Sequence, residues 1–358
     1  MPPWSDRLAP LLDRLRSPAL QTPLDWKAIL AQARGLGVRG KKVEGVVGMS
    51  LQPDGIGMAH MTFPGGPGEK PRLLHCQFHP LAAGQSPGRV AAAMVKARKL
   101  EKARFAGVLD RGSYVLFPAE APDLPREEWA SAMRWRIKEQ IEFPPAQAVI
   151  EVFDMPGPIP DRDSGRIYVA VARGADVRRH VNLFLDGGLN LTAIDIPELA
   201  LRNLAAGLAD DREGMALLHL EAGHGLVLML KKGRFYLSRR IEIGLHALLE
   251  SLVDASEEDL PRAISNSRLV DQIALEAQRT MDYFESHFSQ ASAVSLHIAP
   301  LVTPIPGLRQ ALAERLGMRV KEFPLQEVLD LADGIDEREA ARVLLALGAA
   351  LGERGGAA

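Results

Sequence analysis

The sequence carries the same short plan twice, and this repeat limits the fold more than any other feature. Residues 215–243 read as three apolar runs separated by glycine-containing turns, and a helical pattern follows from Leu245. Residues 43–78 show three such runs as well, followed by a helical pattern over 89–100 and a further apolar run over 105–109. Short apolar runs between turn signals are typical of antiparallel strands. We therefore predict two similar α/β halves, each built on a three-stranded meander, that face each other across a cleft.

The turns between the first and second predicted strands of each half are the candidate functional residues. When two such halves face each other, a nucleotide usually lies in the cleft against these turns, because clefts between domains are preferred sites for small ligands. The turns span 50–55 in the first half and 221–225 in the second. Their candidate nucleotide-contacting residues are Ser50, Gln52, Asp54, Glu221, Gly223 and Gly225.

Length, charge and cysteine content limit the class of protein. A chain of 358 residues is long enough for two lobes with a core each. The formal net charge of −2 gives no basic excess of the kind that nucleic-acid binding needs. The single cysteine, Cys76, excludes an intramolecular disulfide and fits a reducing compartment.

The sequence shows neither an export signal nor a membrane span. Charged residues such as Arg7 and Arg14 interrupt the start of the chain, so it lacks the apolar core of a signal peptide. The most apolar segment, 343–351, is far shorter than the ~20 residues that span a bilayer. We therefore expect a cytoplasmic protein without a membrane span of its own.

Two apparent motifs are better explained without chemistry. Residues 35–42 resemble a phosphate-binding P-loop, but Lys42 replaces the hydroxyl residue that holds Mg²⁺. The segment also joins a helix to a strand, in the reverse of the required order, so we interpret it as a linker. His75 and Cys76 are adjacent in a predicted strand and point to opposite faces, so we predict no metal site there.

A helix is predicted over 126–141, outside the repeated plan. Asp123 can cap it and Pro125 lies in its first turn. Trp135 lies off the apolar stripe of this helix, and it either joins the core or forms part of a binding face. The stripe, which we expect in the core, comprises Trp129, Met133, Ile137 and Ile141.

The remaining patterns divide the chain into lobes and an insertion. The longest helical pattern, 266–288, is predicted to cross the back of the second sheet. Near the start of the chain, 4–16 has one apolar helical face that either packs on the main body or contacts a membrane or a partner. The predicted parts are an N-terminal helical extension (1–42), a first lobe (43–111), an inserted α/β subdomain (112–190), a return to the first lobe (191–209), a second lobe (210–335) and a C-terminal helix and tail (336–358).

Short motifs spread over the chain add a resemblance. They are Arg-Trp-Arg-Ile-Lys at 134–138, Glu-Phe-Pro at 142–144, Tyr-Val-Ala-Val-Ala at 168–172, Ala-Ile-Asp-Ile-Pro-Glu-Leu-Ala at 193–200, Leu-Ser-Arg-Arg-Ile at 237–241, Glu-Ala-Gln-Arg at 276–279, Tyr-Phe-Glu-Ser-His at 283–287 and Leu-Gly-Ala-Ala-Leu-Gly at 347–352. In this order they resemble the PilM family, which comprises actin-like, FtsA-related cytoplasmic proteins of type IV pilus assembly. The MshI branch, from biogenesis of the mannose-sensitive haemagglutinin (MSHA) pilus, is the most similar. The resemblance covers 43–352 and leaves the first forty residues outside it.

The resemblance implies a fold, a partner and a place in the cell. The fold would be the duplicated actin-like (ribonuclease H-like) one, with 112–190 as its inserted 1C-type subdomain. The protein would be a cytoplasmic component of a pilus assembly platform, held at the inner membrane by the short tail of a PilN-like protein. That tail would lie in a groove between the first lobe and the insertion, with the helix 126–141 and Trp135 as its wall. Association of several copies into a ring would fit the same role.

The nucleotide site is where the sequence departs from the family pattern. Active members carry Asp-x-Gly-x-x-Ser in the first turn, whereas 48–54 reads Gly-Met-Ser-Leu-Gln-Pro-Asp. The second turn should offer Asp-x-Gly and reads Glu-Ala-Gly at 221–223. The adenosine-binding loop should be glycine-rich, whereas 299–306 holds three prolines, which lack a backbone donor. Since Mg²⁺ needs carboxylate ligands, we expect a degenerate site that uses neither ATP nor Mg²⁺ as a cofactor.

Three functions remain open on this basis. The first is a non-catalytic scaffold that binds the tail of a membrane protein. The second is a functioning actin-like ATPase in the same machinery, with Glu221 and the 223–225 loop as its remaining nucleotide contacts. The third is a sugar-kinase-like enzyme on the same fold, for which no catalytic aspartate can be named. Fold alone does not choose among them, because one fold supports many activities.

Overall fold

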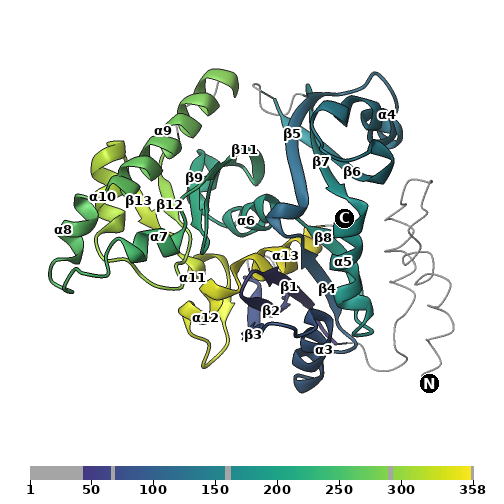
Figure 1. The fold of residues 1–358 in the computed structure, drawn as a ribbon, viewed down its shortest axis with the longest axis horizontal. Coiled ribbons are helices and arrows are strands. Elements are labelled where there is room, and N and C mark those ends of the chain that lie inside the picture. The colour runs from purple at the N-terminus through teal and green to yellow at the C-terminus, as the bar shows by residue number, and fades with distance from the viewer. Residues whose placement is uncertain (1–42, 66–68, 158–162, 289–292, 356–358) are drawn as a thin grey trace.

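The computed structural model describes residues 43–65, 69–157, 163–288 and 293–355 (Figure 1). The predicted N-terminal extension, including 4–16 and the P-loop-like stretch 35–42, lies outside the described residues. Two large sheets stand apart from each other, and a smaller sheet lies beside them at the upper right of the view.

The first meander belongs to a six-stranded sheet with the order β14-β3-β2-β1-β4-β8. Its first three strands pair antiparallel, and β4 and β8 then add in parallel on the other side of β1. The strands are β1 (Val46–Gln52), β2 (Gly55–Thr62), β3 (Arg72–Pro80), β4 (Arg104–Val108), β8 (Asn190–Asp195) and β14 (Asp330–Leu331). Nearly every residue of β1 and β2 is buried, as expected for strands that read as continuous apolar runs.

The second meander belongs to a separate five-stranded sheet with the order β11-β10-β9-β12-β13. The strands are β9 (Met215–Leu220), β10 (Gly225–Lys231), β11 (Arg234–Ile241), β12 (Leu296–Ile298) and β13 (Val320–Glu322). Here too, three antiparallel strands are followed by two that add in parallel next to the first strand. The repeat seen in the sequence is therefore confirmed as two sheets that share one order of five strands, to which the first sheet adds β14.

Helices cover both sheets and fill the space between them. The first sheet carries α3 (Pro87–Ala97) and α5 (Gly174–Leu185), and the second carries α9 (Arg268–Phe288) and α10 (Leu308–Leu316). In the middle of Figure 1, α6 (Pro197–Ala205) and α13 (Leu344–Gly355) pack against each other. Shorter helices are α7 (Leu245–Glu250), α8 (Leu260–Ser265), α11 (Leu325–Val328) and α12 (Glu337–Arg342). Within the described ranges, none of these helices has both the length and the apolar character needed to cross a bilayer.

The stretch 112–190 contributes a third sheet with the order β5-β7-β6. Its strands are β5 (Tyr114–Glu120), β6 (Ala148–Pro156) and β7 (Asp163–Arg173), and α4 (Trp129–Arg136) packs on β6. Met133 and Ile137 join buried residues of these strands in a small core of their own. In contrast, α5 packs with α3 on the six-stranded sheet.

Two helices predicted from the sequence differ in the structure. The one expected over 126–141 is α-helical only in α4, and single 3-10 turns precede and follow it. The one expected over 337–351 is broken at Val343 into α12 and α13. At the break, the carbonyl of Arg342 accepts a hydrogen bond of 2.9 Å from the Gln52 side-chain amide. A contact between residues so far apart in the chain is not visible in a local helical pattern.

Glycines allow α13 to approach its neighbours closely. A Cβ atom on Gly48 in β1 would lie 1.7 Å from the carbonyl oxygen of Ala346. On the helix itself, a Cβ on Gly348 would lie 2.1 Å from the carbonyl oxygen of Ala200 in α6. The Gly-Ala-Ala-Leu-Gly stretch at 348–352 is thus a packing motif that holds α13 against α6 and β1.

The chain crosses from the first lobe to the second just before β9, and one carboxylate fixes this crossing. Asp210 Oδ2 accepts hydrogen bonds from Ser295 Oγ (2.7 Å), His297 Nε2 (3.0 Å) and Lys321 Nζ (2.6 Å). Burial opposes ionisation of Asp210, but the bonds from Lys321, Ser295 and His297 outweigh it and hold its pKa well below the usual range. Ser295, His297 and Lys321 all come from the β12–β13 region of the second sheet.

This carboxylate should make stability depend on pH. A folded-state pKa below the unfolded value of about 3.9 adds stability above that value, which is lost as the pH falls through the folded pKa. We expect Asp210→Asn to lower the free energy of unfolding at pH 7, and the difference from the unchanged chain to shrink below about pH 4. Urea denaturation at pH 7 and pH 3 measures this. Asp271→Asn, at an ion pair on the surface, is the control, and an Asp210→Asn deficit that stays constant with pH would contradict the assignment.

Candidate functional site

The first predicted turn is held by contacts within the protein. Ser50 is buried, and Gln52 Nε2 donates to the Arg342 carbonyl and lies 3.4 Å from Ser50 Oγ. Asp54 is exposed at the tip of the turn, where its backbone carbonyl accepts from Leu81 N. The partners of this turn therefore come from the segment after β3 and from the broken C-terminal helix. The amide of Gln52 already has a partner there.

The second predicted turn holds its carboxylate between two imidazoles. Glu221 lies 3.5 Å from His219 Nε2 and 3.3 Å from His224 Nε2. Burial opposes ionisation of Glu221, but His219 and then His224 outweigh it and hold its pKa below the ordinary value. Gly223 is exposed and Gly225 is the buried first residue of β10.

The backbone of this second turn packs tightly on the segment before α7. A Cβ atom on Gly244 would lie 2.4 Å from both Gly223 C and His224 N. Leu245 N donates to the Glu221 carbonyl (2.7 Å) and His246 N to the Ala222 carbonyl (3.0 Å). Backbone donors at the start of α7 thus bind two carbonyls of the turn, and these hydrogen bonds fix the conformation of the turn.

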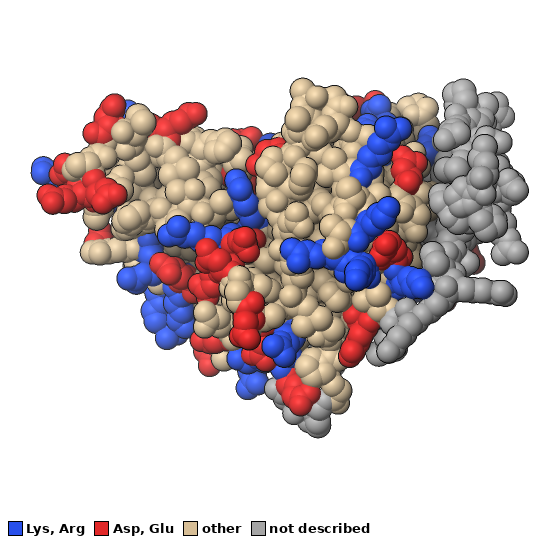
Figure 2. Space-filling model, turned by 90° about the horizontal axis from the view of Figure 1, so that it is seen from below, with Lys and Arg blue, Asp and Glu red and all other residues tan. Residues whose placement is uncertain are grey.

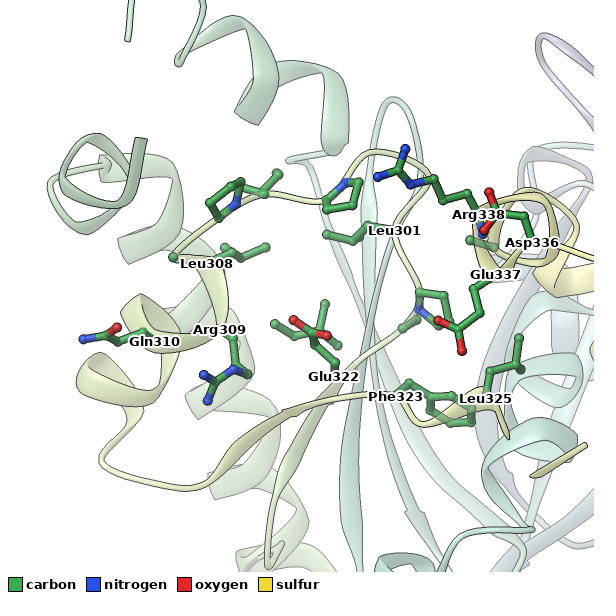
Figure 3. Close-up of a pocket in the computed structure, with 18 residues that line it drawn as sticks. Leu301, Leu308, Arg309, Gln310, Glu322, Phe323, Leu325, Asp336, Glu337 and Arg338 are labelled. Carbon is green, nitrogen blue, oxygen red and sulfur yellow. The ribbon is translucent and has the colours of Figure 1, made fainter. Parts of the chain in front are cut away.

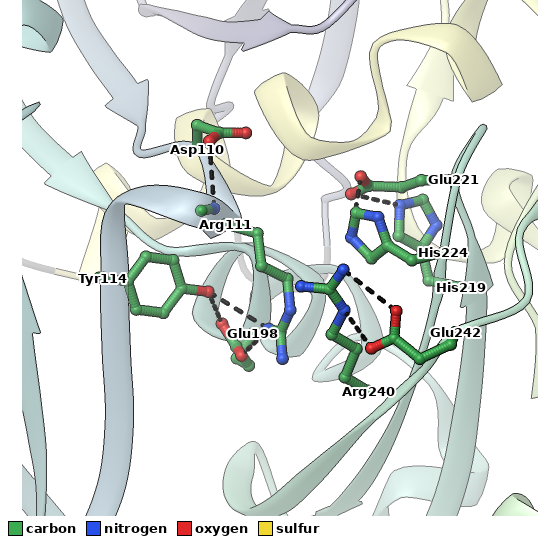
Figure 4. A network of polar contacts seen from close by, with 10 residues as sticks. Asp110, Arg111, Tyr114, Glu198, His219, Glu221, His224, Arg240 and Glu242 are labelled. Atoms are coloured by element: carbon green, nitrogen blue, oxygen red, sulfur yellow. Dashed lines mark hydrogen bonds and ion pairs between the residues drawn. The ribbon is translucent and has the colours of Figure 1, made fainter. Parts of the chain in front are cut away.

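A third carboxylate, which sequence reasoning missed, lies between the lobes (Figure 4). Glu198, the second residue of α6, is 1% exposed. Its carboxylate pairs with the Arg111 guanidinium and accepts from the Tyr114 hydroxyl. Ser238 Oγ in β11 lies 3.5 Å from it. A glutamate at a helix start is an ordinary sequence feature, and Arg111, 87 residues away, could not be assigned to it from the sequence.

The carboxylates in this region each have a partner from the protein. Figure 4 shows Glu198 with Arg111, Glu221 between its two histidines, and Glu242 with Arg240 at 2.9 Å. Across the described ranges, no group of three or more His, Cys, Asp or Glu side chains is placed to hold a metal ion.

The proline-containing loop 299–306 borders a cavity of about 480 Å³ (Figure 3). Pro300, Pro304 and Pro306 line it, together with Phe323 and Leu325. Charged groups come from both sides: Glu322 and Arg309 from the second lobe, and Asp336, Glu337 and Arg338 from the start of α12. Asp336 and Glu337 already accept hydrogen bonds, from Arg338 N and the Gln326 side chain. The cavity could hold a small molecule with an apolar body, but its prolines supply no backbone donor.

A second cavity, of about 230 Å³, lies where the β1–β2 turn, the end of β4 and α5 meet. His180 on α5 lines it, is 5% exposed and has no hydrogen-bond partner for Nε2. Burial lowers the pKa of His180 to about 4, so the imidazole is neutral near pH 7. Gly107 leaves room for it, since a Cβ there would lie 2.4 Å from Nε2. The other lining residues are Leu51, Gln52, Pro53, Leu109, Asp110, Ser113, Asp176 and Arg179.

The two tryptophans of the insertion have different surroundings. Trp135 is 85% exposed, so it does not join the core. Trp129 is only half-buried, which corrects its prediction as a core residue; its Nε1 donates to the Leu124 carbonyl (2.9 Å) and Arg126 lies over its ring. Met133 and Ile137 of the same stripe are buried as expected. Trp129 is the first residue of α4 and packs against the small core only in part.

Charge on the lower face of the molecule is mixed (Figure 2). Basic and acidic side chains are interspersed there, without a continuous basic stripe. Such a distribution lacks the electrostatic footprint of a nucleic-acid interface on this face.

The described chain is similar to a solved structure with a known role. The structure of the PilM–PilN type IV pilus biogenesis complex matches with a TM-score of 0.66, at 18% sequence identity, over 88% of this chain and 99% of that chain. The chain has an actin-like fold. At this sequence identity the similarity establishes the actin-like fold, and the predicted resemblance to PilM is confirmed at that level.

Other comparisons are more distant. A Bacteroides thetaiotaomicron protein with an actin-like ATPase fold and unknown function has a TM-score of 0.43 at 7% identity, over 83% of this chain and 95% of that one. The cytoplasmic domain of EpsL, from the Vibrio cholerae type II secretion system, has a TM-score of 0.42 at 10% identity, over 85% and 94%. Similarity at this level carries no functional argument. No protein-family model matches the sequence, and no curated protein does.

Proposed function

We propose that this chain is a non-catalytic actin-like scaffold of a type IV pilus assembly platform. In this role it binds the cytoplasmic tail of a PilN-like inner-membrane protein, works in the cytoplasm against that membrane, and associates with its own copies. The observation that supports the proposal most is the match to the structure of the PilM–PilN complex, which spans 88% of this chain and 99% of the matched chain. The sequence motifs, which are most similar to MshI, favour a platform of MSHA type.

We propose that the cytoplasmic tail binds at the 230 Å³ cavity. It lies between the first lobe and α5, the helix that follows β7 in the 112–190 stretch, and one wall is the β1–β2 turn. The unpartnered His180 Nε2 offers a hydrogen bond to an incoming group, and a buried polar atom gains most from such a partner. Trp135, on the surface of α4, is the second candidate contact. Substitutions at His180 and Trp135 separate the two.

We expect a synthetic tail peptide to bind the chain and Trp135→Ala to weaken it by at least ~1 kcal/mol, about fivefold, the scale of an aromatic interface anchor. Isothermal titration calorimetry measures this, and circular dichroism checks the fold. Val253→Ala is the matched control, because Val253 is also an exposed apolar side chain (78%) but lies on the second lobe. Unchanged affinity in folded Trp135→Ala would place the groove elsewhere. His180→Leu, which removes the imidazole at similar volume, then tests the cavity.

The absence of catalysis is the second part of the proposal. Its support is the pairing of Glu198, Glu221 and Glu242 within the protein, together with the hydrogen bond that Gln52 makes to Arg342. Phosphoryl transfer depends on positioned donors and metal-supported charge, and these side chains are engaged elsewhere.

We therefore expect no heat from MgATP at micromolar concentration in calorimetry, and no phosphate release. A chain with a functional actin-like site is the positive control. A dissociation constant near micromolar, with hydrolysis, would contradict the scaffold proposal. It would favour the second candidate, an actin-like ATPase, for which the 480 Å³ cavity beside Arg309 and Arg338 is the supporting observation.

A further inference from the structure

An aromatic cluster joins the inserted sheet to the second lobe. Phe153 in β6 and Tyr168 in β7 stack with ring centroids 5.4 Å apart, and Tyr168 lies 5.1 Å from Phe235 in β11. The Tyr168 hydroxyl also donates to the backbone carbonyl of Tyr236. Tyr168 and Phe235 are 5% and 4% exposed, and both belong to a buried cluster that runs through the second sheet, α6, α13 and part of the first sheet. The insertion therefore contributes side chains to a core that both lobes share.

The buried carboxylate of Glu198 makes a second connection between the same parts. Tyr114 begins β5 of the insertion, and Ser238 belongs to β11 of the second lobe. Both hydroxyls lie against Glu198 on α6, beside Arg111. Pulling these elements apart would leave a buried charge without its partners, which is costly in a low-dielectric interior.

The position of these contacts determines what they do. The backbone passes between the lobes twice, from α6 to β9 and from β13 to β14. Two crossings alone would allow the lobes to hinge. The insertion contacts lie at β11, the edge strand of the second sheet, in the upper half of Figure 1, whereas α11 on the return path lies below. These contacts lie beside the first crossing, where Gly233 N donates to the Asp211 carboxylate two residues before Phe235. Side-chain attachments at this point restrict rotation about the crossing.

We propose that the insertion is a built-in brace that fixes the closure of the two lobes. The brace consists of Phe153, Tyr168 and Phe235 together with the contact of Tyr114 and Ser238 at Glu198. In two-lobed proteins that close around a ligand, contacts to the ligand fix the angle between the lobes, and this angle changes when the ligand leaves. In this chain the protein's own side chains fix the angle, so the lobes keep one relative orientation whether or not a nucleotide is present. The brace deepens the proposed scaffold role but stands on its own contacts.

Distance measurements between spin labels on the two lobes test the brace in the full chain. Labels at Glu101→Cys and Glu314→Cys, both exposed positions, report on the first and second lobe, and the native Cys76 is buried. We expect a single narrow distance peak that MgATP does not move. In Tyr168→Leu the peak should broaden or shift by several ångström, the scale of a released hinge.

A matched control separates bracing from general destabilisation. Phe105→Leu alters a buried aromatic pair of similar spacing, Phe105 and Phe184 at 6.3 Å, within the first lobe only. It should lower the melting temperature without changing the distance peak. An unchanged peak in Tyr168→Leu, or a peak that moves with MgATP in the unchanged chain, would overturn the brace. If Tyr168→Leu does not fold, Phe153→Leu decides: it removes another ring of the same cluster, and an unchanged peak again overturns the proposal. Binding and hydrolysis of MgATP with no change in distance would contradict the non-catalytic function and leave the brace standing.

Discussion

Replacing Gly48 with alanine is expected to lower the free energy of unfolding by about 3 kcal/mol or more, at or beyond the upper end of overpacking costs. The new Cβ would lie 1.7 Å from the Ala346 carbonyl oxygen and 2.7 Å from its carbon. Both are backbone atoms of α13, so no side chain can rotate away. Either β1 or the whole helix must move, and α13 is packed against α6, β1, β2 and β4 at once.

Urea denaturation followed by circular dichroism measures this loss. Gly65→Ala is the control, because nothing lies within 4 Å of a Cβ at that position. It should change stability by no more than about 0.5 kcal/mol, as for most surface substitutions. Equal stability of the two variants would show that α13 does not rest on β1 in the folded chain.

Replacing Glu198 with alanine is expected to cost about 3–5 kcal/mol, because it leaves the Arg111 guanidinium partly buried without its carboxylate. The Arg111 side chain is 17% exposed, and Tyr114 and Ser238 lose the same acceptor. The loss should exceed that of an ordinary surface ion pair because water reaches the site poorly. Thermal and urea unfolding both report it.

The control for this second prediction is Glu242→Ala. Glu242 forms an ion pair with Arg240 at 2.9 Å, but its side chain is 79% exposed. Exposed pairs contribute at most about 1 kcal/mol, so this variant should remain close to the unchanged chain. The double variant Arg111→Met with Glu198→Leu should recover part of the loss, since it removes both buried charges. Failure of that recovery would indicate that the pair does not account for the cost.

The sequence by itself determined the elements that depend on local pattern. Short apolar runs between glycine turns are typical of strands, so the pattern along the chain is enough to locate β1–β3 and β9–β11. Their repetition determined the duplicated fold, because two copies of one pattern bury their apolar faces in the same way. The long α9 followed from its apolar stripe for the same reason.

Candidate residues were predictable only where a turn identified them. The sequence indicated the 50–55 and 221–225 turns, and the imidazoles beside Glu221 were near enough in the chain to be read with it. The hydrogen bond that Gln52 makes was not predictable, because its acceptor, the Arg342 carbonyl, lies 290 residues away and is available only where α12 ends. The nucleotide and partner roles of these residues stay predictions until ligand binding is measured.

Only the tertiary structure decided the contacts that join distant segments. Glu198 could be read as a helix-start residue, but its burial with Arg111 arises because α6 lies between the two sheets and the insertion folds back over it. The break at Val343 likewise coincides with a hydrogen bond from Gln52, in a distant part of the chain. A sequence pattern indicates which face of a helix or strand is apolar. It does not indicate which other element covers that face, because many helices or strands would bury the same apolar area equally well.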